Sequence, residues 1–310
     1  MIEIVKNTKI KFLSARKFAY IFSICLVSLG LFAIYRISAG KANMGLDFTG
    51  GISLQIKFSE HVTTDKIRAV MDKLGYNASL QKVGVETENI YLIRAMLKDS
   101  STAGSEEITK ALKKELNDEN LEILEENVIG PVVSAQLKQK ALYAVFFAAI
   151  GILVYIWIRF QFKFAVAATI ATIHDVLTIL GIMVLLGKEV DILMITALMT
   201  IAGYSLTDMV VVFDRIRENM RNILKEPFES IINRSINEVL GRTINTSLTT
   251  ILVSVSLYLF GGDVLHNFAL AITLGIIVGT YSSWFVASAI IFDWDNYEKK
   301  RKLAAGANVR

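Results

Sequence analysis

The stretch Ile201–Asn219, IAGYSLTDMVVVFDRIREN, places a carboxylate, Asp208, inside an apolar run that begins at Ile192. An ionisable side chain at the centre of a membrane-spanning helix costs about 2.5 to 3.5 kcal/mol on insertion scales, so it is usually functional. We therefore interpret Asp208 as a proton-binding group in a membrane protein. The apolar run ends in a group of charged residues, for which a solvated interfacial face is the simpler interpretation: Asp214, Arg215, Arg217 and Glu218.

The composition of the chain is that of a membrane protein with a water-exposed part. Of its 310 residues, 53% are hydrophobic and 20% are charged, and the mean hydropathy is +0.48, which soluble domains rarely reach. The net charge of +4 is modest, and we interpret it as a signal of membrane topology, with no nucleic-acid partner. Cys25 is the only cysteine, so the sequence offers neither a disulfide framework nor a zinc site, and we expect no bound metal.

Six apolar segments are each long enough, at about 1.5 Å per residue, to cross a hydrocarbon layer of about 30 Å. They are predicted at residues 18–36, 141–158, 164–186, 192–213, 243–260 and 268–292. Lys and Arg concentrate in the segments 1–17, 159–163, 214–240 and 293–310, whereas the other two short loops carry more acid than base. The positive-inside rule therefore places both termini in the cytoplasm, together with a predicted helical segment at 214–240. The first apolar segment is not followed by a signal-peptide cleavage site.

Residues 37–139, between the first and second predicted helices, form a water-soluble domain on the external side. Apolar and polar residues alternate from Ile52 to Phe58, as they do in a half-buried strand. Further strands are predicted at 80–85, 90–97 and 121–125, and helices ending near Leu74 and Leu116. The resulting order β-α-β-β-α-β predicts a ferredoxin-like domain. The fold class is therefore a polytopic α-helical membrane protein with six transmembrane helices and an external α+β ferredoxin-like domain between the first and second.

Polar side chains lie at depth in the third, fourth and fifth predicted helices. Arg242 opens the fifth helix, and Asp208 lies near the same end of the fourth, so we expect the two to meet at similar depth. Because a guanidinium stays charged at any relevant pH, a small change in their separation would change the proton occupancy of Asp208. The accompanying intramembrane polar residues are His174, Asp175, Tyr204, Ser205, Thr246 and Thr249.

The intramembrane polar residues, Asp208 included, also have a structural interpretation, because such groups often hydrogen-bond between helices. For Asp208 the functional interpretation is preferred. His174 and Asp175 fit a structural pair as readily as a functional one, and the sequence leaves both interpretations open. The Ser and Thr residues of the fifth helix are for the most part explained by helix packing. Two glycines four residues apart, Gly275 and Gly279, predict a close contact between helices.

Five motifs are distributed over almost the whole chain: GLDFTGG at Gly45–Gly51, IGP at Ile129–Pro131, the pair His174–Asp175, GYSLTDMVVVFDRIREN at Gly203–Asn219 and GRTINTSLTT at Gly241–Thr250. Together they resemble the SecF family, the protein-export membrane subunits of the SecD/SecF group in the resistance-nodulation-division superfamily. Thr207 departs from the family pattern, in which Asn is usual, but the exchange is a conservative polar one. The external-domain motif comprises Gly45, Asp47, Phe48, Gly50 and Gly51.

The resemblance implies a function and a set of partners. The chain would be half of a twelve-helix bundle in the bacterial cytoplasmic (inner) membrane, with SecD supplying the other six helices. The pair would associate with the SecYEG channel, with YajC, with membrane lipid and with the translocating preprotein. It would use the proton-motive force to promote preprotein translocation, as a translocase subunit and not as an enzyme, with no cofactor. The resemblance also assigns the proton path to Asp208 and Arg242.

Three other functions remain open on the residues alone. A small-molecule exporter of the same superfamily would need larger external regions than residues 37–139 provide. An intramembrane aspartyl protease would need two carboxylates on consecutive helices, as Asp175 and Asp208 are, but Asp208 is not in a Gly-x-Gly-Asp setting. The only prolines are Pro131 and Pro227, so the Pro-Ala-Leu loop of such proteases cannot be present. A purely structural assembly factor would need no protonatable carboxylate at all.

Overall fold

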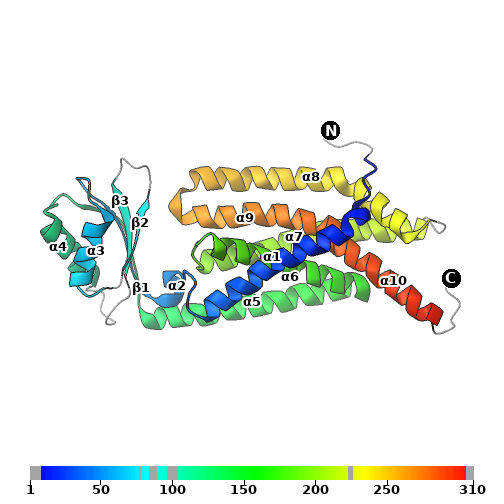
Figure 1. Ribbon diagram of the computed structural model, residues 1–310, viewed down its shortest axis with the longest axis horizontal. Helices are drawn as coiled ribbons and strands as arrows, with labels where there is room; N and C mark the ends of the chain where they lie inside the picture. Colours follow the sequence, from blue (N-terminus) through cyan, green and yellow to red (C-terminus); the bar gives the residue numbers. More distant parts are fainter. Residues whose placement is uncertain (1–7, 77, 84–88, 96–103, 223–225, 305–310) are drawn as a thin grey trace. The chain divides into compact units, whose positions relative to one another are not determined.

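The chain folds into two compact units, which are described separately. The membrane unit comprises Met1–Asn43 and Val145–Arg310, and the inserted unit comprises Met44–Ala144. The structure, a computed structural model, describes residues 8–76, 78–83, 89–95, 104–222 and 226–304 (Figure 1).

Six helical segments in the described part of the chain are long and apolar enough to cross a membrane, as predicted. They are formed by the short turn η1 (Phe12–Ala15) with α1 (Arg16–Ser38), by α5 (Pro131–Arg159), α6 (Phe162–Leu185), α7 (Ile192–Asn222) and α8 (Phe228–Phe260), and by α9 (Gly262–Ser282) continued through η2 (Ser283–Ala287) and α10 (Ser288–Ala304). Within the membrane unit, α7, α8 and α9 lie side by side (Figure 1). Because η2 is a π-helical turn, the helix predicted at 268–292 is not regular throughout.

The segment predicted as helical at 214–240 is helical at 214–222 and 228–240, but these residues belong to the two long neighbouring helices. α7 runs on to Asn222, and α8 already begins at Phe228, directly after Pro227. Arg and Glu are good helix formers, so both helices continue past the roughly 20 residues that a membrane requires. At the opposite end of α8, the predicted loop 261–267 is reduced to Gly261, since Gly262 adopts a φ of 71° and the chain reverses directly.

Two other predicted boundaries are also wrong by several residues. The helix predicted at 141–158 begins at Pro131, a residue favoured at the first position of a helix. The tail predicted at 293–310 is helical as far as Ala304, because Lys, Arg and Glu favour continuation of the helix. Both differences lengthen helices at their water-exposed ends, where hydropathy alone gives no signal.

The basic segment before α1, predicted as a tail at 1–17, is bound to the membrane unit over its described part. Phe12 and Leu13 are buried among the helices. Asn237 of α8 accepts a hydrogen bond from the backbone nitrogen of Ile10 at 3.0 Å and donates to its backbone oxygen at 2.9 Å. Asn233, one turn earlier on α8, accepts from the backbone nitrogen of Leu13 at 3.1 Å. Residues 1–7 lie outside the described part of the chain.

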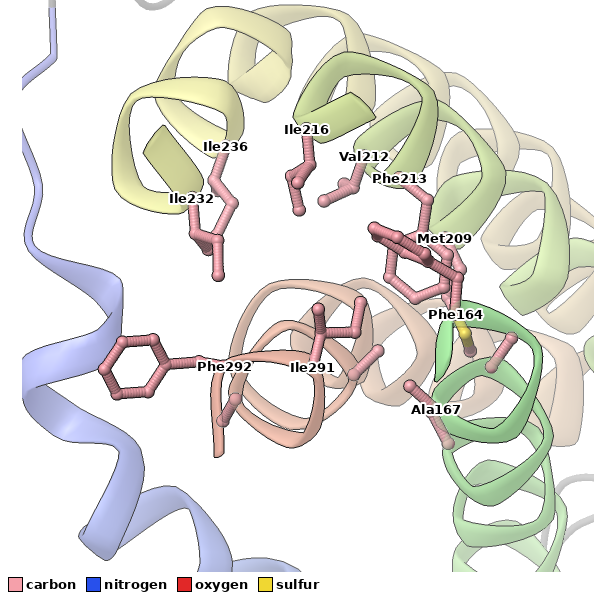
Figure 2. Packing of buried hydrophobic residues seen from close by; sticks show 14 of the residues in the cluster. Phe164, Ala167, Met209, Val212, Phe213, Ile216, Ile232, Ile236, Ile291 and Phe292 are labelled. Atoms are coloured by element: carbon pink, nitrogen blue, oxygen red, sulfur yellow. The ribbon is translucent and has the colours of Figure 1, made fainter. Parts of the chain in front are cut away.

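An apolar core forms where α6, α7, α8 and α10 meet (Figure 2). Phe164 of α6 and Phe213 of α7 pack edge to face, with ring centroids 5.3 Å apart, an arrangement that adds about 0.5 to 1.5 kcal/mol to simple burial. The core therefore holds the charged ends of α7 and α8 against the rest of the bundle. The same core contains Met209, Val212, Ile216, Ile232, Ile236 and Ile291.

The inserted unit has the predicted order β-α-β-β-α-β, with one short helix, α2 (Leu46–Thr49), before it. The strands form one antiparallel sheet in the order β2-β3-β1-β4. Ile52, Leu54 and Ile56 are fully buried in the core between this sheet and the helices at 64–73 and 104–116 of the same unit. The elements are β1 (Gly51–Lys57), α3 (Thr64–Lys73), β2 (Ala78–Val83), β3 (Ile90–Ala95), α4 (Gly104–Leu116) and β4 (Glu122–Ile129).

The helices α3 and α4 lie on the same face of this sheet (Figure 1). Lys73 at the end of α3 donates to Glu115 near the end of α4, and this hydrogen bond holds the pKa of the Glu115 carboxyl below its usual range. β4 is longer than the predicted 121–125 because it pairs with β1 along its whole length. Residues 84, 85, 96 and 97 of the predicted strands lie outside the described part of the chain.

Candidate functional site

Asp208 lies on the inner face of α7, and only 5% of its surface is exposed. Its Oδ2 atom is buried and has no hydrogen-bond partner among the described protein groups, while the Thr280 side chain of α9 interacts with the carboxylate. An ionised carboxylate left in this state would lose its solvation without full compensation. The position therefore suits a carboxyl group that binds a proton, or one that gains a positive partner when the helices move.

A chain of hydroxyl groups from three helices leads to this carboxylate through Thr280. Tyr204 of α7 donates to the Ser247 hydroxyl of α8 at 3.3 Å, and Ser247 is hydrogen-bonded to the Thr280 hydroxyl of α9 at 2.8 Å. Hydroxyls can both donate and accept, so the chain can adapt to either protonation state of Asp208. The sequence identified Tyr204 as a candidate but not Thr280. Thr280 directly follows Gly279 on the side of α9 that packs closely, and this position is the sequence signal that could have identified it.

Asp175 of α6 is the centre of a second, fully buried group of hydrogen bonds. Its carboxylate is bonded to His174 Nδ1 at 2.8 Å and accepts from Ser282 Oγ of α9 at 2.7 Å. It also accepts from Ser205 Oγ of α7. Three helices are thus joined at one carboxylate, which favours the structural interpretation of the His174–Asp175 pair. Ser282 is a further partner that the sequence did not single out.

The glycine pair on α9 makes the close contact that was predicted, and the contact is with α7. A Cβ added to Gly275 would lie 2.4 Å from Ile201 Cδ1, and one added to Gly279 would lie 3.2 Å from Ser205 Cβ. The small residues let the α9 backbone approach α7 at the level of Ser205, three residues before Asp208. This packing sets the position of both hydrogen-bond groups.

The expected meeting of Asp208 with Arg242 does not occur within this chain. Arg242 is exposed, and no ion pair links it to any described carboxylate. Thr243 and Ser247 are the buried residues of this part of α8, so the face that carries Arg242 is turned away from the bundle. Arg242 also does not open its helix, because α8 begins at Phe228. The direction in which a side chain points from a helix is set by packing and not by hydropathy.

Thr246 and Thr249 share the exposed face of Arg242, and their hydroxyls donate to backbone oxygens of α8 at 2.9 Å. A matching stripe on α7, with residues spaced by three or four, is also exposed. Threonine hydroxyls bonded within their own helix leave a small, weakly polar surface that suits contact with other helices. We define the exposed polar face as Thr196, Thr200, Gly203 and Thr207 of α7 with Arg242, Thr246 and Thr249 of α8.

The external-domain motif Gly45–Gly51 forms the entry to the inserted sheet. Gly45 precedes the short helix α2, which contains Asp47 and Phe48. Gly50 and Gly51 have φ angles of 67° and 131°, and a Cβ on Gly51 would lie 2.5 Å from the backbone oxygen of Ala95. Glycine is therefore required at the start of β1, because any side chain would collide with β3. The motif thus forms the turn that leads into β1 in this unit.

Comparison with known proteins gives consistent matches over the whole chain. The family model described as protein export membrane protein SecD/SecF, C-terminal, matches residues 108–297, and the SecD/SecF GG motif model matches residues 41–60. A protein translocase subunit SecF from Thermodesulfovibrio yellowstonii is 50% identical over 294 residues, covering 94% of this chain and 96% of that protein. One from Vibrio alginolyticus is 38% identical over 292 residues, covering 94% and 91%.

Solved structures of SecDF are similar to this fold. A crystal structure of SecDF, a translocon-associated membrane protein from Thermus thermophilus, has a TM-score of 0.82 and 34% identity, covering 94% of this chain. SecDF in a super-membrane-facing form has a TM-score of 0.71 and 34% identity, covering 97% of this chain. This chain spans only 39% and 41% of those two chains.

Proposed function

Because this chain belongs to the SecD/SecF family of protein export membrane proteins, we propose that it is a SecF-type subunit of the Sec machinery, driven by protons that bind Asp208. The observation that carries the proton-coupled part is the buried Asp208 carboxylate, one oxygen of which has no hydrogen-bond partner among the described residues. Protonation removes the charge that makes this position costly. In this proposal the subunit promotes preprotein translocation across the bacterial cytoplasmic membrane, with no enzymatic step and no cofactor.

Proton entry can supply enough free energy for a conformational change. One charge that moves through about 100 mV releases about 2.3 kcal/mol, which is comparable with the contact energy of a few side chains. Arg242 is the counter-charge in this proposal, although it is apart from Asp208 in the present arrangement. Its approach to Asp208, by movement of α8, would stabilise the ionised state and so release the proton.

The exposed polar face supports a partner that supplies further helices. Arg242 directed at hydrocarbon would be costly, and threonines spaced along α7 and α8 allow close approach of other helices. The solved SecDF chains are more than twice as long as this one, and their name joins SecD and SecF. We assign SecD as the partner at this face. SecYEG, YajC, the preprotein and membrane lipid complete the assembly expected from the family resemblance.

The finer topology follows from charge and from the order of strands. The inserted unit is a ferredoxin-like domain, supported by its order β-α-β-β-α-β and by a sheet in which β1 and β3 are central. It lies outside the cytoplasmic membrane, because the basic segments at both ends of the membrane unit favour the cytoplasm. In this position it is the element through which helix movement reaches a preprotein.

The structure gives no support to an aspartyl protease. Asp175 and Asp208 do not share a proton or a hydrogen bond, since the partners of Asp175 are His174, Ser205 and Ser282. A catalytic dyad requires two carboxyl groups close enough to share a proton.

The proposed function is tested by Asp208→Asn in membrane vesicles that contain the Sec machinery. The variant should insert and co-purify with its partners but lose the stimulation of preprotein export that an imposed proton gradient gives to the wild type. Asp214→Asn is the matched control, because Asp214 lies on the same helix, is 40% exposed and pairs with Arg159 at the surface. Gradient-stimulated export that persists in Asp208→Asn at the wild-type level would show the proposal to be wrong.

A further inference from the structure

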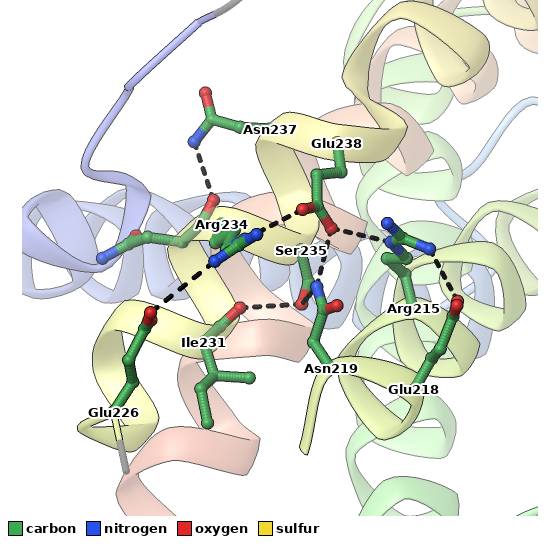
Figure 3. Close-up of polar contacts among 10 residues, drawn as sticks. Arg215, Glu218, Asn219, Glu226, Ile231, Arg234, Ser235, Asn237 and Glu238 are labelled. Atoms are coloured by element: carbon green, nitrogen blue, oxygen red, sulfur yellow. Dashed lines mark hydrogen bonds and ion pairs between the residues drawn. The ribbon is translucent and has the colours of Figure 1, made fainter. Parts of the chain in front are cut away.

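The charged ends of α7 and α8 are joined by a network centred on the carboxylate of Glu238 (Figure 3). Arg215 Nε and Asn219 Nδ2, both on α7, donate to Glu238 Oε2 at 2.7 and 2.6 Å. Asn219 is buried and also donates to Ser235 of α8 at 3.0 Å. Hydrogen bonds to an ionised group are about twice as strong as neutral ones. The network is therefore a specific bond between the two helices.

The arginine–glutamate pair of this network is better protected than an ordinary surface pair. The Arg215 and Glu238 side chains are 34% and 26% exposed, and the same stretches of α7 and α8 contribute Ile216, Ile232 and Ile236 to the apolar core. Partial burial reduces screening by salt, and the second donor on Glu238 fixes the geometry. Two other pairs at the same place link residues of one helix only.

These two intrahelical pairs share the same charged groups. Arg215 also donates to Glu218, three residues further along α7, at 2.7 Å. Glu238 also accepts from Arg234, four residues earlier on α8, at 3.0 Å. Because neither pair connects α7 with α8, Glu218 and Arg234 provide controls for the loss of charge without the loss of the helix–helix bond.

The network lies close, along both helices, to the two groups of the proposed proton path. Arg215 follows Asp208 by seven residues on α7, close to two turns, and Glu238 precedes Arg242 by four residues on α8, close to one turn. At about 1.5 Å per residue, Arg215 lies about 10 Å from Asp208 along one helix, and Glu238 about 6 Å from Arg242 along the other. The bond between Arg215 and Glu238 thus constrains how α8 can move against α7 next to Asp208 and Arg242.

We propose that Arg215, Asn219 and Glu238 form a latch that holds α7 and α8 in the arrangement with Asp208 and Arg242 apart. The latch residues are positioning residues, since they touch neither Asp208 nor Arg242. A movement of α8 against α7 that turns Arg242 toward Asp208 must break the Arg215–Glu238 bond. This inference rests on the proposed function, because it assigns a role in the proton cycle of Asp208.

The first test compares interhelical with intrahelical substitutions in the complete complex. Arg215→Gln should lower gradient-stimulated export about tenfold, the change expected for loss of about 1.4 kcal/mol of coupling. It should also shift, by about one pH unit, the midpoint of the Asp208 carboxyl band in infrared spectra, identified by subtraction of Asp208→Asn. Glu218→Gln and Arg234→Gln should change neither quantity. Unchanged export and an unchanged midpoint in Arg215→Gln, with Asp208→Asn inactive, would overturn the latch and leave the proposed function standing.

A charge exchange keeps the proposal falsifiable if Arg215→Gln is merely unstable. Arg215→Glu with Glu238→Arg is made in a background of Glu218→Gln and Arg234→Gln, because the exchanged charges would otherwise be repelled by their helical neighbours. The exchange should restore both the infrared midpoint and part of the export stimulation relative to Arg215→Gln. A folded, partner-bound exchange variant that restores neither would contradict the latch.

Discussion

Gly30 of α1 and Gly181 of α6 meet backbone to backbone: a Cβ added to Gly181 would lie 2.5 Å from the backbone nitrogen of Gly30. A Cβ added to Gly30 would in turn lie 2.4 Å from the backbone oxygen of Leu177. Neither neighbour is a flexible side chain that could move away. The contact fixes α1 against α6, the helix that carries His174 and Asp175.

Gly181→Ala should destabilise the membrane unit by about 1 to 3 kcal/mol, the usual cost of an inserted methyl group in a well-packed core. The measurement is the thermal unfolding midpoint in detergent. Gly151→Ala on α5 is the matched control, because a Cβ there meets no other atom within 4 Å and Ala is the better helix former. Equal midpoints for Gly181→Ala and the wild type would contradict this packing.

Gly51→Ala should disrupt the inserted sheet, because the new Cβ would collide with the backbone oxygen of Ala95 and because φ at this position is 131°. Gly130→Ala should have little effect, because Gly130 directly follows Ile129, the partner of Gly51 in β4, and open space surrounds its Cβ position. Limited proteolysis of the inserted unit in membrane vesicles distinguishes the two. Faster cleavage is expected for Gly51→Ala alone, and equal rates for both variants would argue against the collision.

Ser282→Ala and Ser205→Ala should each lower stability by about 1.5 to 3 kcal/mol, because each removes a buried hydrogen bond to the Asp175 carboxylate. Ser256→Ala is the control, since Ser256 is exposed and donates only to its own helix, to Leu252. Thermal unfolding measures the difference. If Asp175 only joins helices, the folded fraction of each variant should keep its gradient-stimulated export. Loss of that stimulation without loss of stability would instead assign Asp175 to the proton path.

Thr249→Leu should weaken association with the second helical unit, because it adds bulk to the exposed polar face of α8. If the face contacted lipid, leucine would be tolerated or even favoured. Contact with helices and contact with lipid therefore predict opposite effects of this substitution. The readout is the amount of SecD that co-purifies, with a decrease of about tenfold expected for loss of about 1.4 kcal/mol. Leu248→Phe tests an apolar exposed position of the same helix and should leave co-purification unchanged. Undiminished SecD with Thr249→Leu would exclude this face as the interface.

The sequence predicted the site residue Asp208 and the order of elements, but it did not predict which polar groups meet. Asp208 was identified because a carboxylate in an apolar run is costly wherever the run is placed, an argument that needs no neighbours. Its pairing with Arg242 was wrong within this chain because depth along a helix is readable from sequence, whereas rotation about the helix axis depends on all the surfaces that pack around it. Thr280 and Ser282 escaped notice for the same reason.

The ends of the helices show the same difference between what the sequence indicates and what the structure contains. The segment at 214–240 carries a clear change from apolar to charged residues, and that change correctly marks where the apolar part of α7 ends. It does not mark the end of the helix, because hydrogen bonding along the backbone continues as long as the residues favour it. The network around Glu238 could not be foreseen, since it joins residues of two helices that are 19 to 23 positions apart in the sequence.

By itself the sequence determined the six apolar helices, the inserted β-α-β-β-α-β unit and the buried carboxylate, because each depends on local pattern and on the cost of a charge in an apolar medium. Only the tertiary structure decided that Asp175 joins three helices, that Glu238 receives Arg215 and Asn219, and that Arg242 faces outward. These contacts depend on helix rotation and close approach, which are fixed when small residues such as Gly181 and Gly279 let backbones come together.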